Sequence, residues 1–211
     1  IVLGSTEASD VATITAIVLA NSFPTGGIDT GGAADESDGF MFGLRQTNTT
    51  TITCTMGTSG VTTTRTCRFH VAEFSSGVST QEGSTVTDTD PENITITGVT
   101  LAESYVAHAG WRTRDAATVD LEWNGDGNGR LTTSTNLRWE GSQAVTATLD
   151  WNVADYTGAA TQSSTASMLT TDASITATIT AVTLAESVLH HGLGVLGGTA
   201  STHAERHRIR G

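Results

Sequence analysis

A group of potential metal ligands with regular spacing lies in the glycine-rich segment Asn124–Gly129, which Glu122 precedes. Side chains that carry oxygen stand at alternate positions of this segment, at Asn124, Asp126 and Asn128. Calcium-binding loops use this spacing, because every second side chain can turn an oxygen toward one centre. The bidentate glutamate that such loops need further on is absent, and Thr135 stands there instead. The segment therefore predicts either a calcium site or ordinary Asn-Gly and Asp-Gly hairpin turns.

The two cysteines of the chain are the second candidate for chemistry. Residues 52–56 alternate apolar side chains with threonine, as a half-buried strand does, and residues 64–69 are typical of the returning strand. Antiparallel pairing of these strands places Cys54 opposite Cys67, where a disulfide stabilises by roughly 3 kcal/mol on the loop-entropy model. The alternative is two buried free thiols that pack as small hydrophobic side chains. The sequence leaves both alternatives open.

A basic tail ends an otherwise acidic chain. Ten cationic residues, all of them arginine, face 22 acidic residues, for a net charge of −12. Residues 203–211 carry three arginines and Glu205, so the tail is +2 and the remainder is −14 (−12 minus +2). We expect the tail to dock on the acidic surface of a neighbouring copy, because arginine binds carboxylates in a bidentate manner. Nucleic-acid contact and a disordered tail are the alternatives. The arginines are Arg206, Arg208 and Arg210.

Transition-metal binding and catalysis have little support in the sequence. Four late histidines are potential metal ligands, but no cysteine or carboxylate pattern accompanies them at ligand spacing, so we expect solvated or interface histidines. The sequence has no Gly-x-Ser-x-Gly elbow, no phosphate-binding glycine loop and no His-Glu-x-x-His pair. We therefore expect no enzymatic activity and no cofactor apart from calcium. The histidines are His190, His191, His203 and His207.

Composition narrows the class of protein further. The acidic balance argues against a nucleic-acid partner and against binding to an anionic membrane. Only 37% of the residues are hydrophobic and there is no long apolar run, so we expect no membrane insertion. Helix-forming residues are scarce, whereas threonine, valine and isoleucine are abundant, which favours strands. The sequence begins at Ile1 rather than Met, and we expect that something preceded it.

A ten-residue block that begins with Ile-Thr occurs three times along the chain. It starts at Ile14, Ile96 and Ile179, so the copies are 82 and 83 residues apart (96 − 14 and 179 − 96). A second block repeats with the same offset, because residues 67–74 match residues 149–156 (149 − 67 = 82). Two independent blocks with one offset indicate a tandem array.

The predicted fold class is all-β, with two tandem antiparallel β-sandwich repeats of about 82 residues and a partial third unit. Apolar residues alternate with threonine in each block, and the alternation changes phase at Gly98, as at a β-bulge or a sheet corner. Typical strand and turn lengths predict roughly seven to nine strands per repeat. The predicted units are residues 1–91, residues 92–173, and residues 174–211 with the basic tail.

The cysteine positions have counterparts in the second repeat. Cys54 aligns with Trp139, and Cys67 aligns with Leu149. Because both counterparts are large apolar residues, we expect these positions to face the core in both repeats.

The partial third unit, from residue 174 onward, is short of strands to pair with. An uncovered sheet edge or apolar face is a liability unless something covers it. A neighbouring subunit can supply the missing strands by strand addition or exchange. Alternatively, the half-unit packs onto the second repeat as extra strands. The first alternative predicts a homo-oligomer.

Residues 69–83 and 94–105 resemble the Thr/Gly-rich tandem-repeat proteins of tailed bacteriophages. In that family an aromatic-x-Val-x-Glu-Phe strand, a Gly-Val-x-x-Gln-x-Gly turn and a Thr-rich strand that ends near Ser-aromatic recur. The second repeat keeps the strand motif at Val153–Tyr156 but departs from the turn motif at Thr157–Gln162. The resemblance implies a virion structural component of the tail, the fibre or the capsid surface, without catalytic residues.

We therefore expect a non-enzymatic structural protein of an extracellular particle, in the first place a phage virion, that assembles through β-sheet edges. Its partners would be further copies of itself and other virion or surface-structure proteins. A prokaryotic cell-surface filament or adhesin subunit is one alternative. A glycan-binding module is another, because exposed aromatic rings stack on sugars. The aromatic residues beside acidic loops are Trp111, Trp123 and Tyr156.

Overall fold

The computed structural model describes residues 1–4, 7–29, 42–56, 64–87, 91–113, 127–141, 147–162 and 176–183. The described part contains strands and two single-turn 3-10 helices, η1 (Leu19–Asn21) and η3 (Leu101–Glu103), but no α-helix. The first six strands are β1 (Val2–Leu3), β2 (Ser9–Thr13), β3 (Ser22–Asp29), β4 (Phe42–Asn48), β5 (Thr51–Met56) and β6 (Arg65–Glu73). The other six are β7 (Val78–Thr87), β8 (Glu92–Thr95), β9 (Ser104–Thr113), β10 (Gly127–Thr133), β11 (Asn136–Gly141) and β12 (Ala147–Tyr156). The predicted all-β class is confirmed.

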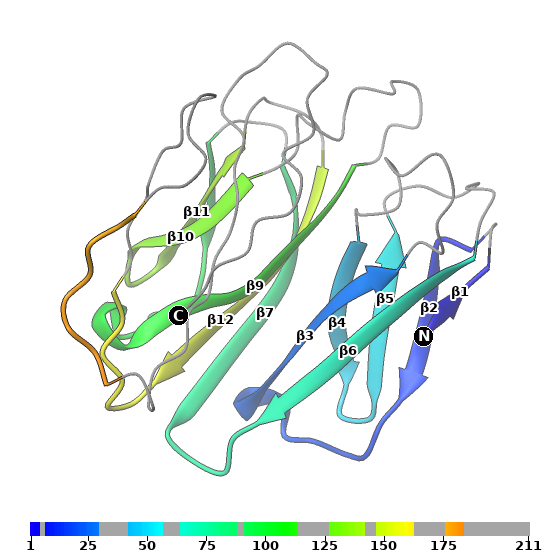
Figure 1. Cartoon of the computed structure of the whole chain (residues 1–211), viewed down its shortest axis with the longest axis horizontal. Coiled ribbons are helices and arrows are strands. Elements are labelled where there is room, and N and C mark those ends of the chain that lie inside the picture. Colours follow the sequence, from blue (N-terminus) through cyan, green and yellow to red (C-terminus); the bar gives the residue numbers. More distant parts are fainter. Residues whose placement is uncertain are drawn as a thin grey trace.

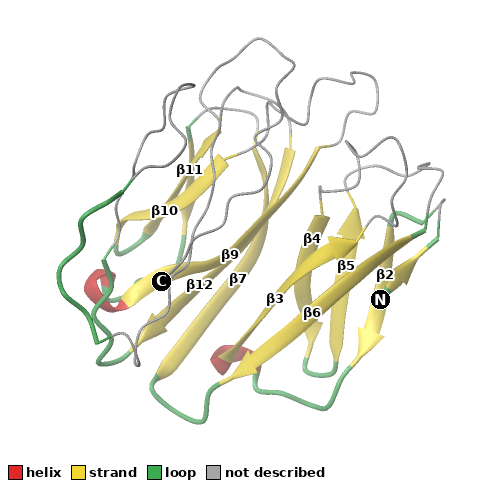
Figure 2. Cartoon of the chain, in the orientation of Figure 1, coloured by secondary structure: helices red, strands yellow, loops and turns green. Residues whose placement is uncertain are grey.

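Each group of six strands forms two antiparallel three-stranded sheets, and the two groups lie side by side (Figures 1 and 2). The first sandwich has the sheets β1-β6-β3 and β2-β5-β4. The second has the sheets β7-β12-β9 and β8-β11-β10, so the strands follow the same order. Each sandwich therefore has six described strands, fewer than the seven to nine that strand length suggested.

Strand β7 belongs to the second sandwich, although it precedes residue 91. It pairs with β12 over ten positions, from Val78 with Tyr156 to Thr87 with Ala147. Its counterpart β1 pairs with β6 at only Val2 and Leu3. The predicted division at residue 91 thus falls after a strand that pairs with the group downstream of it.

The alternation of apolar side chains and threonine builds both cores. On β5 the inward side chains Ile52, Cys54 and Met56 are buried, while the threonines between them are partly exposed. Beta-branched residues suit such a pleat. Isoleucine packs on the inner face, while the threonine hydroxyls meet water on the outer face. The first core consists of Leu3, Leu44, Ile52, Cys54, Met56 and Cys67. The second consists of Ile94, Ile96, Leu137, Trp139, Leu149, Trp151 and Val153.

The change of phase at Gly98 marks a passage between sheets. Strand β8 ends at Thr95, residues 96–100 are irregular, and η3 leads into β9, which lies in the other sheet. The first sandwich passes from β2 to β3 in the same way, through residues 14–18 and η1. The sheet-corner alternative therefore fits better than a β-bulge within one strand.

The two cysteine-bearing strands are not partners in one sheet, contrary to the predicted hairpin. Strand β5 pairs with β2 and β4, whereas β6 pairs with β1 and β3. Cys54 and Cys67 therefore lie in opposite sheets of the first sandwich and share its core. The hairpin prediction failed because sandwich connections often pass from one sheet to the other.

Candidate functional site

The passage between the sheets is fastened at both ends in the first sandwich. The Ile17 N–H donates to the Thr49 carbonyl at 2.8 Å. The Val18 N–H donates to the Glu73 carboxylate at 2.7 Å, and Glu73 is the last residue of β6. The Ser22 hydroxyl donates back to the Val18 carbonyl at 2.8 Å. The Glu73 carboxylate, at the end of β6, thus holds the segment that leads from one sheet of the first sandwich to the other.

The second sandwich repeats these bonds one repeat length later. The Val99 N–H donates to the Ser134 carbonyl at 2.9 Å. The Thr100 N–H donates to the Asp155 carboxylate at 2.9 Å, and the Ser104 hydroxyl donates to the Thr100 carbonyl at 2.8 Å. In both sandwiches the carboxylate lies 55 residues after the N–H that it accepts. The blocks identified in the sequence therefore make corresponding contacts.

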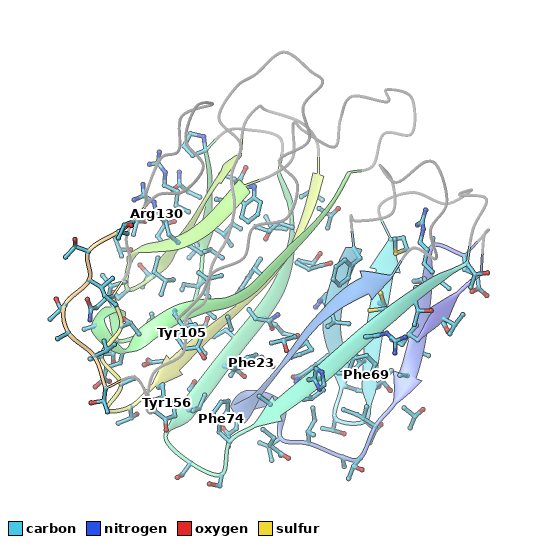
Figure 3. All side chains as sticks on the ribbon, in the orientation of Figure 1. Phe23, Phe69, Phe74, Tyr105, Arg130 and Tyr156 are labelled. Atoms are coloured by element: carbon cyan, nitrogen blue, oxygen red, sulfur yellow. The ribbon has the colours of Figure 1, made fainter. Side chains whose placement is uncertain are left out.

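The two sandwiches meet on a small apolar surface. Phe23, Ala107 and Ala154 are buried there, and the rings of Phe23 and Phe74 stack with centroids 5.9 Å apart. Phe74 also contacts Tyr156, with centroids 6.0 Å apart and an edge-on geometry. Figure 3 shows Phe23, Phe74 and Tyr156 near one another, toward the lower ends of the two groups of strands. Aromatic contacts of this kind add about 0.5–1.5 kcal/mol beyond area burial.

Strand β7 connects the sandwiches through its side chains. The Thr80 hydroxyl lies 2.8 Å from the Leu19 carbonyl and 2.9 Å from the Ser22 carbonyl, both in the first sandwich. Glu82 accepts the Gln46 N–H at 3.2 Å and lies 4.0 Å from the Arg45 guanidinium. Burial raises the pKa of Glu82, and the bond from Gln46 opposes that rise.

The residues that follow β12 repeat the contacts by which the start of β7 joins the first sandwich. Gly77 and Gly158 both have positive φ, 76° and 87°, directly before corresponding segments. The Thr161 hydroxyl lies 3.4 Å from the Leu101 carbonyl, as Thr80 lies against Leu19, and the Thr161 N–H donates to the Ala102 carbonyl at 2.9 Å. Positive φ favours glycine, so the backbone conformation of these two turns accounts for a glycine at both positions.

A glutamine holds the next copy of the repeated block in both places. The Gln81 amide donates to the Thr97 carbonyl at 2.8 Å and accepts the Thr97 N–H at 2.8 Å. The Gln162 amide donates to the Thr180 carbonyl at 3.1 Å and accepts the Thr180 N–H at 2.7 Å. The second repeat therefore keeps the glutamine contact although its turn departs from the Gly-Val-x-x-Gln motif. The common spacing Gly-x-x-x-Gln, at Gly77–Gln81 and Gly158–Gln162, was the signal that would have identified it.

The third copy differs from the second in exposure. Ile96 is 6% exposed in the second core, whereas the corresponding Ile179 is 55% exposed. Val182, Tyr156 and Leu101 are also large apolar residues with exposed side chains. We call Leu101, Tyr156, residues 158–162 and residues 176–183 the end surface. In the described part of the chain, no strand pairs with residues 176–183.

Neither a protein-family model, nor a curated protein, nor a solved structure matches this chain. Its function is therefore inferred from its own geometry. The two 3-10 turns of the described residues are both too short to form a membrane-crossing helix. In the same part of the chain, no three His, Cys, Asp or Glu side chains are placed to hold a metal ion.

Several predicted site residues lie outside the described residues, and the hypotheses about them stay predictions. Of the predicted calcium segment, residues 127–129 lie at the start of β10. The backbone of Asn128 pairs with Glu140 there, and the backbone of Trp111 lies in β9. Tyr156 is exposed, as the glycan hypothesis requires. The residues outside the described ranges are Glu122, Trp123, Asn124, Asp126, His190, His191, His203, Arg206, His207, Arg208 and Arg210.

Proposed function

We propose that this protein is a non-enzymatic structural component of an extracellular particle, in the first place a phage virion, and that it assembles through its sheet edges and end surface. The end surface carries the proposal. It repeats the bonds that join the two sandwiches within the chain, yet its apolar side chains are exposed. A surface of this type is suited to a further sandwich of the same kind.

We take the further sandwich to be the first sandwich of a second copy. In that sandwich β1 covers β6 only at Arg65 and Thr66, whereas β7 covers the whole of β12. Among the described residues, no strand pairs with β6 beyond Cys67 on the side where β1 lies. The backbone of β6 there is therefore available to an added strand. Residues 159–162 hold the same place relative to Gly158 as the start of β7 holds relative to Gly77. Pairing of residues 159–162 with β6 would repeat the β7–β12 contact between copies.

Such an interface is head-to-tail, because the end surface of one copy meets a different surface of the next. Head-to-tail contacts form rings when the rotation closes and filaments when it does not. A shell, tube or fibre is built in this way. The threonine-rich exposed strand faces suit a particle surface, since they keep β-branched packing with a wetted exterior.

The proposed self-association is tested with the 211-residue chain by light scattering over a concentration series. We expect wild-type mass to rise with concentration, and Ile179→Asp with Val182→Asp to weaken association at least about tenfold, because charge replaces apolar area at the contact. Val86→Asp is the matched control, since Val86 is 53% exposed but lies outside the end surface. A monomeric wild-type protein at every concentration would refute self-association.

The particle assignment needs a separate measurement. Mass spectrometry of purified particles should find the protein in fixed stoichiometry with the major particle proteins. Its absence from purified particles would remove the virion proposal, whatever the association data show.

A further inference from the structure

Two cysteines face each other across the core of the first sandwich. Cys54 lies on β5 and is 0% exposed, and Cys67 lies on β6 and is 1% exposed. Their strands belong to opposite sheets, and both side chains belong to one apolar cluster with Leu3 and Leu44. A covalent bond between them would therefore join the two sheets of the sandwich.

The second sandwich shows that these two positions are neighbours by virtue of the fold. Trp139 on β11 and Leu149 on β12 take the corresponding places, and both are buried in one cluster. Strands β11 and β12 also lie in opposite sheets. One sandwich thus fills this place with a large apolar pair, and the other fills it with two thiols.

The two thiols lie within hydrogen-bonding reach of each other. The hydrogen bond between them raises the pKa of Cys54, and burial raises it further. The same bond lowers the pKa of Cys67, against the opposite effect of burial. The positive N-terminus also lowers the pKa of Cys67, and its amino group donates to the Cys67 carbonyl at 3.1 Å. The closeness of the two sulfurs, rather than a difference between them, is what a disulfide requires.

We propose that Cys54 and Cys67 form an intrachain disulfide that links the two sheets of the first sandwich, with a small-molecule disulfide as the oxidant. One of the two cysteines, as its thiolate, attacks one sulfur of the oxidant, and the first thiolate of the oxidant leaves and takes up a proton. The other cysteine then loses its proton and attacks the protein sulfur of the mixed disulfide, which expels the second thiolate of the oxidant. The chain loses two protons and two electrons, and the oxidant becomes two thiols.

Burial determines when the exchange takes place. Since neither sulfur is exposed in the closed sandwich, an oxidant reaches them only before the sheets close or while they are apart. The bond should therefore form during folding rather than in the folded protein. Once it has formed, the same burial protects it from reductants in solution.

The test refolds the wild-type chain in a glutathione redox buffer or in excess reductant, and then alkylates each sample in denaturant. After oxidative refolding we expect a monomer that has lost two hydrogen masses and takes up no alkylating reagent. The reduced sample should take up two equivalents. Two equivalents after oxidative refolding, or disulfide-linked dimers, would overturn the proposal.

Thermal unfolding provides the second readout. Cys54 and Cys67 are 13 positions apart (67 − 54). A bridge over a loop of this length lowers the unfolding equilibrium constant about a hundredfold on the loop-entropy model, and the midpoint should rise by about 10 °C. All four tryptophans, Trp111, Trp123, Trp139 and Trp151, lie in the sequence span of the second sandwich. Circular dichroism should therefore report the shift more strongly than tryptophan fluorescence.

The Cys54→Ala, Cys67→Ala double variant is the control, because its midpoint should not depend on the redox buffer. A redox-dependent midpoint in that variant would assign the shift to another cause and refute the inference. If the double variant does not fold, the alkylation result on the wild-type chain still decides the matter. This inference is independent of the particle assignment.

Discussion

Gly83 on β7 should accept a side chain only at a cost in stability, because it lies directly against the ring of Trp151 on the neighbouring strand. A Cβ built on Gly83 overlaps the Cζ2 and Cε2 atoms of that ring. The indole has little freedom to move, since Trp151 is 9% exposed and its Nε1–H donates to the Thr85 hydroxyl at 3.1 Å. We therefore expect Gly83→Ala to force the ring or the strand out of place.

The magnitude is set by two opposing effects. Overpacking of a well-filled core costs about 1–3 kcal/mol. Replacing glycine by alanine also restricts the unfolded chain, which stabilises by about 0.4–1 kcal/mol. The net loss is about 1–2 kcal/mol, which corresponds to a midpoint lower by about 2–8 °C for a chain of this length. Thermal unfolding followed by tryptophan fluorescence is the suitable assay, because Trp151 lies against the substituted position.

Gly27→Ala is the matched control. Gly27 also lies in a strand, β3, but a Cβ built on it meets nothing within 4 Å. We expect this variant to be unchanged or slightly more stable, through the unfolded-chain effect alone. If Gly83→Ala proved as stable as Gly27→Ala, the importance of the Gly83–Trp151 contact would be refuted.

Two further predictions concern carboxylates. Glu73→Ala and Asp155→Ala should each cost about 0.5–1.5 kcal/mol in urea unfolding, since each removes one hydrogen bond to the backbone, and the two losses should add; an effect at only one of them would contradict their equivalence. Burial raises the pKa of Glu82 above its ordinary 4.5, so its contribution to stability is complete below pH 4.5 and is lost as the pH rises through the raised pKa. Glu82→Gln should therefore be more stable than wild type at pH 7, and this advantage should vanish below pH 4.5; unfolding curves at both pH values would show it, and a constant difference would contradict it.

The fold could be predicted from the sequence to the level of sheets, but the pairing of strands could not. The alternation around Cys54 and Ile96 identified inward positions correctly, because burial of every second side chain is a local property. Which strand lies beside β5 is a non-local property, and the fact that β6 follows β5 in the sequence misled the prediction. The segment around Gly98 did indicate that the chain changes sheets, since the phase of its apolar alternation changes where the chain leaves one sheet for the other.

The end surface was partly visible in the sequence as well. The repeated Ile-Thr block located Thr97 and Thr180 as corresponding residues. It did not identify Gln81 and Gln162, because a single polar residue has no periodicity to mark it. The offset between these glutamines is 81 residues (162 − 81), one less than the offset of the main blocks, so a strict alignment misses the pair. Side-chain hydrogen bonds to backbone amides are geometric, and the structure was needed to find them.

The carboxylates of Glu73 and Asp155 have a consequence for biosynthesis. Each accepts an N–H that the ribosome makes 55 residues earlier. The hydrogen bond that holds the segment at Val18 therefore cannot form until Glu73 has been translated. The bond that holds the segment at Thr100 cannot form until Asp155 has been translated. Because chains generally fold from the N-terminus as they emerge, each unit should lock only when its final strand arrives, and nascent chains arrested before Glu73 should remain protease-sensitive.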